Sequence, residues 1–293
     1  MTITGKTRVF YTIADPISQV RTPEVFNEVL PLCGIDAVMV PLQVAASDLS
    51  DVVRALFRSP TTAGIVLSIP HKPGAAALVD HCSKAAATAN AVNAIRKNAA
   101  GELEGDLFDG LGFVKSLERY AMTYRGKRIL LIGAGGAASA IATALASAGP
   151  SVLAMFDPDT TRADQLAHSI EAQYGVQTMV PPSNDPAGFD LVINASPLGL
   201  KSDDPLPVPP ERLDRSAQVC DILMKNQPTP LLRAAMARGN AVQPGFDMLI
   251  LQTPFFFDFF GFPEAGNMLR RDDSVVRTLL FPDEVLEMMK PAA

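Results

Sequence analysis

A glycine-rich turn between two apolar stretches constrains the fold of this chain more than any other segment. Residues 129–138 read Ile-Leu-Leu-Ile-Gly-Ala-Gly-Gly-Ala-Ala. This order predicts a strand, a tight turn and a helix. Gly133 lets the backbone turn sharply, Gly135 leaves room for a pyrophosphate, and the free amides that open the helix would hold its charge. The alternative is an ordinary strand-to-helix turn of an α/β protein.

A second apolar strand favours the first interpretation. Residues 152–157 read Val-Leu-Ala-Met-Phe-Asp, so this strand ends in a carboxylate. Asp157 follows the glycines at roughly the spacing expected for an acid that binds both hydroxyls of a ribose. The two segments together predict a Rossmann-type dinucleotide-binding domain.

Length and composition narrow the remaining possibilities. A chain of 293 residues is long enough for two domains with a ligand cleft between them. The net charge of −6, without a basic stripe, argues against nucleic acid as a partner. No apolar run reaches membrane-spanning length and the first residues do not resemble a secretory signal, so we expect a cytoplasmic protein without a membrane partner. The few cysteines and histidines show no metal-ligand spacing, so no metal site is expected: Cys33, Cys82, Cys220, His71, His81 and His168.

The segment before the glycine turn alternates strand and helix patterns. Strands are predicted at 8–13, 36–40, 64–69 and 91–96, and helices at 23–32, at 47–57 with Ser47 as the cap, and at 74–89. This is the pattern of a first α/β domain. We expect a substrate domain at residues 1–105, completed by helices within 244–293, and a cofactor domain at 106–243.

The later segments complete these two domains. A helix at 111–124 is expected to connect them, and residues 201–210, rich in proline and aspartate, predict a surface loop. Strands are expected at 191–194 and 219–223, and a helix at 229–238. Six phenylalanines between 255 and 262 predict a helix that packs on the first domain, or else an exposed partner-binding stripe. The tail, 272–293, predicts one further amphipathic helix.

Two residues stand out as candidates for chemistry. Lys72 lies between Pro70 and Pro73, directly after a predicted strand, where α/β sheets bind ligands. Asp109 follows two apolar residues at the expected domain junction. Lys72 can instead be a solvated surface lysine, and Asp109 a helix cap.

Several motifs, in their order along the chain, resemble those of the shikimate and quinate dehydrogenases. The family's Asn-Pro-Ile-x-His-Ser-x-Ser-Pro corresponds to Asp-Pro-Ile-Ser-Gln-Val-Arg-Thr-Pro at 15–23, and its Asn-Val-Thr-Val-Pro-His-Lys to Val-Leu-Ser-Ile-Pro-His-Lys at 66–72. Its Gly-Ala-Val-Asn corresponds to Asn-Ala-Val-Asn at 90–93, and its Asn-Thr-Asp-Gly to Leu-Phe-Asp-Gly at 107–110. Asn-Ala-Ser-Pro-Leu-Gly at 194–199 is similar to its Asn-Ala-Thr-Pro-Leu-Gly. Asp221, Thr-Pro-Leu-Leu at 229–232, Met248, Leu249 and Gln252 complete the order.

The resemblance implies roles for matching positions. Lys72 would move the proton of the substrate hydroxyl, and Asp109 would hold the same edge of the substrate. The positions that would meet the substrate are Val20, Thr22, Ser68, Asn93 and Gln252. The positions that would meet the cofactor are Gly133, Ala134, Gly135, Gly136, Ala137, Asp157, Arg162, Ser196, Pro197, Leu223 and Gly245.

Departures from the family motifs concern the substrate and the cofactor. Val20 and Thr22 replace two serines for the substrate carboxylate, and Arg21 between them supplies a charge or points to solvent. Leu107, Phe108 and Met224 replace polar or aromatic positions, which predicts a more apolar pocket and a substrate other than shikimate itself.

The cofactor departure lies after the second strand of the cofactor domain. NADP-using members have Asn-Arg-Thr there, whereas this chain has Asp-Pro-Asp at 157–159. Two carboxylates would repel a 2′-phosphate, so NAD is predicted, although Arg162 could contact a phosphate or pair on its own helix.

The sequence thus predicts an NAD-dependent oxidoreductase of α/β class, a monomer or homodimer, that transfers hydride between nicotinamide and a ring secondary alcohol of a shikimate- or quinate-like acid. Two alternatives stay open. One is a dehydrogenase of the same scaffold for another hydroxylated or aminated carboxylic acid, and the other is an NAD-binding sensor without turnover.

Overall fold

The computed structural model describes residues 2–201 and 203–281, and these form two compact units. The first unit contains residues 2–108 and 252–280, and the second contains residues 109–251 and Phe281. The sequence predicted the boundaries between the two domains after residues 105 and 243. The predicted tail helix is present in part, as α10 (Ser274–Leu280), and its residues 282–293 lie outside the described residues.

The first unit contains a mixed sheet in the order β2-β1-β3-β5-β6-β4. β1 pairs in parallel with β2 and β3, β5 is antiparallel to both β3 and β6, and β4 is parallel to β6. Residue 68 and the loop that carries Lys72 follow the carboxyl end of β3. The strands are β1 (Arg8–Ala14), β2 (Ala37–Gln43), β3 (Thr62–Leu67), β4 (His81–Cys82), β5 (Ala94–Lys97) and β6 (Leu103–Asp106).

Two predictions about helices of this unit are wrong. Ser47 is not a cap: it lies inside the 3₁₀ turn η1 (Ala46–Asp48), and α2 (Leu49–Leu56) begins after Asp48 without a side-chain cap. The predicted 74–89 helices are broken into η2 (Ala75–Leu78), the short strand β4 and α3 (Lys84–Ala89). His81 and Cys82 pair with β6 between two alanine-rich segments that stay helical, and Ser83 caps α3 by accepting a hydrogen bond from Ala86 N at 3.2 Å.

Phenylalanine rings form the centre of the first unit. Phe26, on α1 (Thr22–Leu32), stacks on Phe257 with ring centroids 4.6 Å apart, and Phe10 on β1 lies 5.0 Å from Phe260. These contacts confirm that the phenylalanine-rich helix, α8 (Phe246–Phe259), packs on the first unit through its carboxyl-terminal half. Burial of a phenylalanine contributes roughly 2–3 kcal/mol, so this cluster is a major source of stability. α9 (Pro263–Arg271) and α10 follow.

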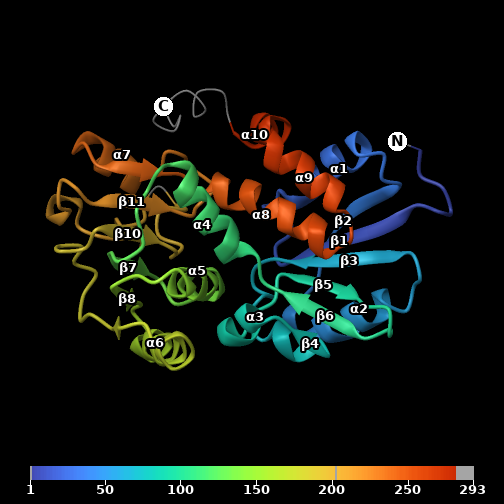
Figure 1. Ribbon diagram of the computed structural model, residues 1–293, viewed down its shortest axis with the longest axis horizontal. Helices are drawn as coiled ribbons and strands as arrows, with labels where there is room; N and C mark the ends of the chain where they lie inside the picture. The colour runs from blue at the N-terminus through green and yellow to red at the C-terminus, as the bar shows by residue number, and fades with distance from the viewer. Residues whose placement is uncertain (1, 202, 282–293) are drawn as a thin grey trace. The chain divides into compact units, whose positions relative to one another are not determined.

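The second unit contains a fully parallel sheet in the order β12-β11-β10-β7-β8-β9. Figure 1 shows β11, β10, β7 and β8 stacked in this order. β7, β8 and β9 follow one another across the sheet, and the chain then returns to place β10 on the other side of β7. The strand order therefore changes direction between β7 and β10, and α/β sheets bind ligands at such a point. The strands are β7 (Arg128–Ile132), β8 (Val152–Phe156), β9 (Thr178–Met179), β10 (Leu191–Asn194), β11 (Gln218–Asp221) and β12 (Ala241–Gln243).

Helices cover the sheet of the second unit. They are α4 (Asp109–Arg119), α5 (Gly136–Ser147), α6 (Thr160–Tyr174), α7 (Pro230–Ala237) and the first half of α8. α4 and α5 approach so closely that a Cβ on Gly110 would lie 2.1 Å from the carbonyl oxygen of Ala140. The sequence predicted this helix at 111–124, whereas α4 begins two residues earlier and ends at Arg119. Ala121 then adopts a positive φ of 50°.

The predicted fold class is confirmed: the chain is an α/β protein with an amino-terminal α/β unit and a Rossmann-type unit. Among the described residues, no helix combines the length and apolar composition that crossing a bilayer requires.

Candidate active site

The glycine turn after β7 has the geometry that its sequence predicts. Gly133 has a φ of +104°, and a Cβ on it would lie 2.8 Å from the carbonyl oxygen of Ala195. Any other residue would therefore be strained and would collide with the neighbouring strand's loop. Gly135 differs, since a Cβ there would meet nothing within 4 Å. The glycine at 133 serves the fold, and the open space at 135 is where a ligand can approach the backbone.

The amino terminus of α5 completes this turn. Gly135 is its N-cap and provides no side-chain hydrogen bond, and Gly136 and Ala137 form the first turn. The first amides of a helix have no partner within it and carry partial positive charge. A pyrophosphate fits such a helix start, because its oxygens accept hydrogen bonds from these amides and no side chain competes.

Asp157 is held beside the glycine turn. Its Oδ2 accepts a hydrogen bond from Ala134 N at 2.8 Å, and its Oδ1 accepts one from Asp159 N at 2.9 Å. The carboxylate of a residue that follows β8 is thus fixed against the loop that follows β7. Each carboxylate oxygen has further acceptor capacity, as binding a ribose diol requires.

Arg162 pairs with its own helix. Its Nε lies 3.1 Å from Oδ2 of Asp159, and both side chains are largely exposed. This geometry corresponds to the local pairing that the sequence left as one of two options. An exposed pair of this kind contributes at most about 1 kcal/mol, so it positions Arg162 weakly.

A buried network joins two loops at the carboxyl ends of β10 and β11. Asp221 accepts hydrogen bonds from Asn194 Nδ2 at 3.1 Å, from Leu223 N at 3.1 Å and from Thr229 Oγ1 at 2.7 Å. Asn194 Oδ1 in turn accepts from Ser196 Oγ at 2.7 Å. The predicted cofactor residues Ser196 and Leu223 are therefore positioned by one carboxylate.

Burial changes the acidity of this carboxylate. Asp221 is 1% exposed, and desolvation raises its pKa from 3.8 to about 6, although its hydrogen bonds to Thr229, Leu223 and Asn194 act in the opposite direction. The sequence placed Asp221 only in a motif. Asp221 ends β11 and Asn194 ends the neighbouring strand β10. Two polar residues at the ends of successive apolar strands are the pattern that could have indicated the Asn194–Asp221 pair.

The last two predicted cofactor positions also lie in this region of the second unit. Pro197 is exposed and follows Ser196. Gly245 lies just before α8, where a Cβ would lie 2.4 Å from the carbonyl carbon of Ile222 and 2.4 Å from the carbonyl oxygen of Leu223. Only glycine permits the backbone to pass this close.

Lys72 lies in the loop after β3 of the first unit, and its backbone is held on several sides. Its carbonyl oxygen accepts hydrogen bonds from Val92 N at 3.1 Å and Ala75 N at 3.3 Å, and His71 N donates to Ser68 O at 2.8 Å. The loop is therefore fixed by its backbone as well as by its prolines. The Lys72 side chain is partly exposed, and Ser68 is too, so both can reach a ligand.

Asn93 and Gln252 come together in the first unit. Asn93 Nδ2 donates to Gln252 Oε1 at 3.2 Å, and Phe108 N donates to Asn93 Oδ1 at 3.0 Å. Both side chains are nearly buried, with exposed fractions of 1% and 5%. The structure thus joins two of the predicted substrate residues, and it adds the backbone amide of Phe108, which the sequence analysis missed because a backbone contact leaves no residue pattern.

Thr22 is buried at the start of α1, and Val20 precedes it in a loop in which Val20 N donates to Ile17 O at 3.0 Å. Arg21 is engaged elsewhere: its guanidinium lies 2.6 Å from Glu24 Oε2, and its Nη2 donates to the carbonyl oxygen of Leu279 at 3.2 Å. The sequence left two possibilities for Arg21, a charge for the substrate carboxylate or a side chain in solvent. The structure shows a third arrangement, in which Arg21 caps the carboxyl end of α10.

Asp109 is the first residue of α4 in the second unit and is 1% exposed. Phe108, which precedes it in the first unit, packs its ring against Phe256 and Phe259, with centroids 5.4 and 5.6 Å away. The two apolar residues before the aspartate, Leu107 and Phe108, are 3% and 5% exposed. Both side chains are therefore buried, and these ring contacts of Phe108 lie within its own unit.

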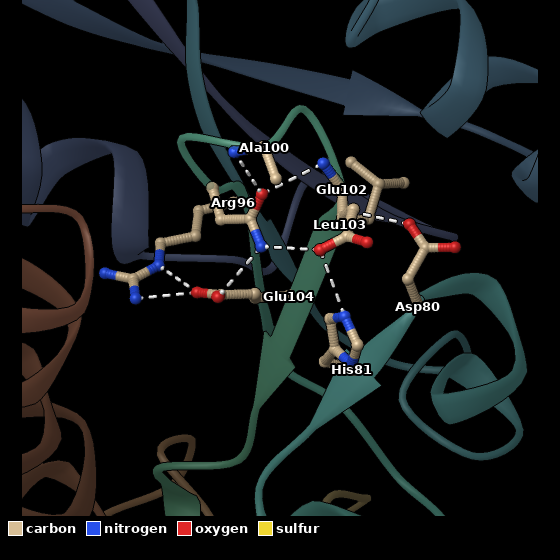
Figure 2. A network of polar contacts seen from close by, with 8 residues as sticks. Asp80, His81, Arg96, Ala100, Glu102, Leu103 and Glu104 are labelled. Carbon is tan, nitrogen blue, oxygen red and sulfur yellow. Dashed lines mark hydrogen bonds and ion pairs between the residues drawn. The ribbon is translucent and has the colours of Figure 1, made fainter.

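A second polar cluster of the first unit belongs to its surface. His81 Nε2 lies 3.1 Å from Glu102 Oε2, and Arg96 Nε donates to Glu104 at 2.8 Å. Figure 2 shows both contacts as dashed lines. The Asn98 and His81 hydrogen bonds lower the pKa of Glu102. His81 and Glu102 are exposed, and their pair connects β4 to the β5–β6 hairpin at the edge of the sheet. None of the residues in this cluster is a predicted site residue.

Comparison with known proteins decides the family. Residues 12–95 match the family model described as the shikimate dehydrogenase substrate-binding domain. The chain is 35% identical over 254 residues to a shikimate dehydrogenase (NADP(+)) of Rubrobacter xylanophilus, with 85% of this chain and 89% of that protein covered. The chain belongs to the shikimate dehydrogenase family.

Solved structures of the family share this fold. Shikimate 5-dehydrogenase from Listeria monocytogenes, solved with shikimate and NAD, superposes with a TM-score of 0.83 at 26% identity, covering 96% of this chain and 99% of that one. Quinate dehydrogenase from Corynebacterium glutamicum, solved with NAD, gives 0.81 at 26% identity, covering 90% and 98%. The resemblance found in the motifs is therefore confirmed over nearly the whole chain.

Proposed function

We propose that this protein is an NAD-dependent oxidoreductase that transfers hydride between nicotinamide and a ring secondary alcohol of a shikimate- or quinate-like hydroxy acid. The observation that carries the cofactor part is the position of Asp157, bound by Ala134 N beside the glycine turn. The substrate part is supported by family membership and by the buried Asn93–Gln252 pair.

The second unit offers a set of groups suited to a dinucleotide. The open space at Gly135 and the uncapped start of α5 fit a pyrophosphate. We assign contacts along the rest of the cofactor to the loops that Asp221 positions, through Ser196, Pro197 and Leu223, and to the backbone at Gly245. When bound, the nicotinamide supplies the hydride acceptor or donor.

The preference for NAD follows from charge. Asp157 and Asp159 place two carboxylates after β8, and Arg162 is paired with Asp159. A ribose diol donates hydrogen bonds to a carboxylate, whereas a 2′-phosphate is repelled by it. Relatives such as the Rubrobacter protein are named NADP(+)-dependent, so the proposal is that this chain differs from them in its cofactor.

Lys72 is proposed as the acid and base of the reaction. During oxidation the alcohol carbon loses hydride and its oxygen loses a proton, and a lysine amine can take that proton or stabilise the alkoxide as an ammonium. The backbone contacts of Lys72 hold its loop in place for this role. Asp109 is proposed to hold the substrate hydroxyl, as the resemblance implies, and its backbone is fixed by the close packing of α4 on α5 at Gly110.

Steady-state rates with the two cofactors test the proposal. With shikimate and quinate as substrates, kcat/KM for NAD⁺ should exceed that for NADP⁺ at least about tenfold, equivalent to ~1.4 kcal/mol. The double variant Asp157→Asn, Asp159→Asn should lower this ratio, because NAD⁺ would bind more weakly and the 2′-phosphate of NADP⁺ would no longer be repelled. The control Asp164→Asn, on an exposed position of α6, should leave it unchanged. A wild-type protein that prefers NADP⁺ would refute the cofactor assignment.

A further inference from the structure

Two loops of the second unit follow β10 and β11, and one side chain joins them. Asn226 Nδ2 donates to the carbonyl oxygens of Gly199 and Leu200, at 3.1 and 3.0 Å. Gly199 and Leu200 belong to the loop after β10, whereas Asn226 lies in the loop after β11. The NH₂ of a carboxamide has two hydrogens, so it can donate to both carbonyl groups. Asn226 therefore connects two segments that lie 26 and 27 positions apart along the chain.

The backbone of Asn226 has a conformation that few residue types adopt. Its φ is +57°, in the left-handed region, which glycine and asparagine enter more readily than other residues. The next residue, Gln227, donates from its side chain to the carbonyl oxygen of Leu223. The turn from Leu223 to Gln227 is therefore closed by one of its own side chains, and Asn226 is the member of this turn that contacts the other loop.

Asp204 binds the same part of the loop after β10. Its Oδ2 accepts from Gly199 N at 3.0 Å and from Lys201 N at 2.9 Å. These backbone hydrogen bonds, that of Lys201 first, lower the pKa of Asp204. Asp204 thus binds amides of this segment while Asn226 binds carbonyl oxygens of the same segment, so both polar sides of its backbone are held by side chains.

The two joined loops carry three of the residues assigned to the cofactor. In the loop after β10, Leu200 N donates to Pro197 O at 3.2 Å, and Ser196 directly precedes Pro197. In the loop after β11, Leu223 lies against the first loop, because a Cβ built on Gly199 would be 3.2 Å from Leu223 Cδ1. The contacts of Asn226 therefore fix the segments in which these assigned residues lie.

The strand order indicates which half of the cofactor meets these loops. The glycine turn follows β7, and Asp157 follows β8. β10 and β11 lie on the opposite side of β7 from β8. A dinucleotide extends across the point at which the strand order changes direction. A cofactor with its adenosine ribose at Asp157 therefore extends its nicotinamide half towards the loops after β10 and β11.

We propose that Asn226 is a positioning residue for the nicotinamide half of the cofactor, because it holds the loop after β10 against the loop after β11. This inference rests on the proposed function and deepens it. Loops that are already joined lose less conformational freedom when a ligand binds, so the contacts of Asn226 favour binding. The adenosine and the pyrophosphate meet the loops after β7 and β8, and their binding does not depend on Asn226.

Calorimetry with NADH and with ADP tests this role. ADP has the adenosine and the pyrophosphate but no nicotinamide nucleoside. Asn226→Gly keeps the left-handed backbone accessible and removes the side chain. Asn226→Asp keeps the size of the side chain but replaces its donor by an acceptor, which two carbonyl oxygens repel. Both variants should bind NADH about five or more times more weakly than the wild type, and their affinity for ADP should change less than about twofold.

Asn184→Asp is the matched control. Asn184 Nδ2 donates to the carbonyl oxygen of Pro207 at 2.8 Å, so this variant also loses a contact between an asparagine side chain and a backbone carbonyl group of the second unit. Neither partner is assigned to the cofactor, and the affinity for NADH should change less than about twofold. A loss of NADH affinity in Asn184→Asp as large as that in the Asn226 variants would indicate general loosening of the unit and would overturn the inference.

The outcomes separate this inference from the function on which it rests. A wild type that binds NADH, with Asn226→Gly and Asn226→Asp binding it equally well, would overturn the inference alone. An equal loss of affinity for NADH and ADP in these variants would do the same, because the effect would then not be confined to the nicotinamide half. A wild type that binds neither NADH nor ADP would overturn both.

Discussion

Replacing Asp221 by asparagine should change how the stability of the second unit depends on pH. The carboxyl is 1% exposed, and burial raises its pKa from 3.8 to about 6. The folded protein therefore holds the proton more tightly than the unfolded chain does. Its contribution to stability is fully present below about pH 4 and is lost as the pH rises through 6.

The size of this effect follows from the two pKa values. One pKa unit corresponds to about 1.4 kcal/mol, so the change from 3.8 to about 6 is worth about 3 kcal/mol between the limits of low and high pH. Between pH 4.5 and pH 7.5 about 2 kcal/mol of it is lost. Asparagine keeps an oxygen that accepts from Asn194 and Leu223, and its NH₂ can donate to Thr229, so the variant should fold without this dependence.

Urea unfolding followed by far-ultraviolet circular dichroism measures this difference. The free energy of unfolding of Asp221→Asn minus that of the wild type should be about 2 kcal/mol larger at pH 7.5 than at pH 4.5, because only the wild type loses stability over this range. Asp164→Asn, which removes an exposed carboxylate of α6, should show no such change. An equal difference between wild type and Asp221→Asn at both pH values would refute the assignment of a raised pKa.

Two further predictions concern the glycine turn and Arg21. Gly133→Ala should lower the free energy of unfolding by about 1–3 kcal/mol or more, because φ is +104° and the Cβ would lie 2.8 Å from Ala195 O. Gly135→Ala should instead leave stability within about 0.5 kcal/mol and weaken NAD⁺ binding at least about tenfold, as thermal unfolding and cofactor titration would show; strong destabilisation by Gly135→Ala would contradict the assignment. Arg21→Ala should cost less than about 1 kcal/mol and change kcat/KM for shikimate less than about threefold, since its partners are Glu24 and Leu279, whereas a loss beyond tenfold would place Arg21 on the substrate.

Local patterns predicted the Rossmann-type fold of the second unit well. The glycine turn, the acid after β8 and the loop at 194–199 each depend on residues close together in the chain, so the sequence displays them directly. The phenylalanine-rich helix was predictable for a different reason, because six large apolar rings must be buried somewhere. That its partners would be Phe10 and Phe26, more than two hundred residues away, could not be seen.

Long-range contacts account for what the sequence did not reveal. The alanine-rich segment at 74–89 favours helices throughout, but His81 and Cys82 within it pair with β6 as a strand. Ser47 has the side chain of a cap, but a 3₁₀ turn carries it past the start of α2. Asn93 and Gln252 were predicted singly as substrate positions, whereas the hydrogen bonds that join them to each other and to the backbone amide of Phe108 are long-range contacts that no residue pattern encodes.

The central claim is that Lys72 performs acid–base chemistry for hydride transfer to NAD. It is tested most directly by nicotinamide absorbance with shikimate, quinate and related hydroxy acids, comparing the wild type with Lys72→Ala. The account predicts NADH formation by the wild type with at least one of these acids, and a rate at least about a hundredfold lower in Lys72→Ala, within the usual contribution of a general acid or base, while NADH still binds with unchanged affinity. An unchanged rate in Lys72→Ala, or a wild type that binds NADH and oxidises none of the acids, would contradict it.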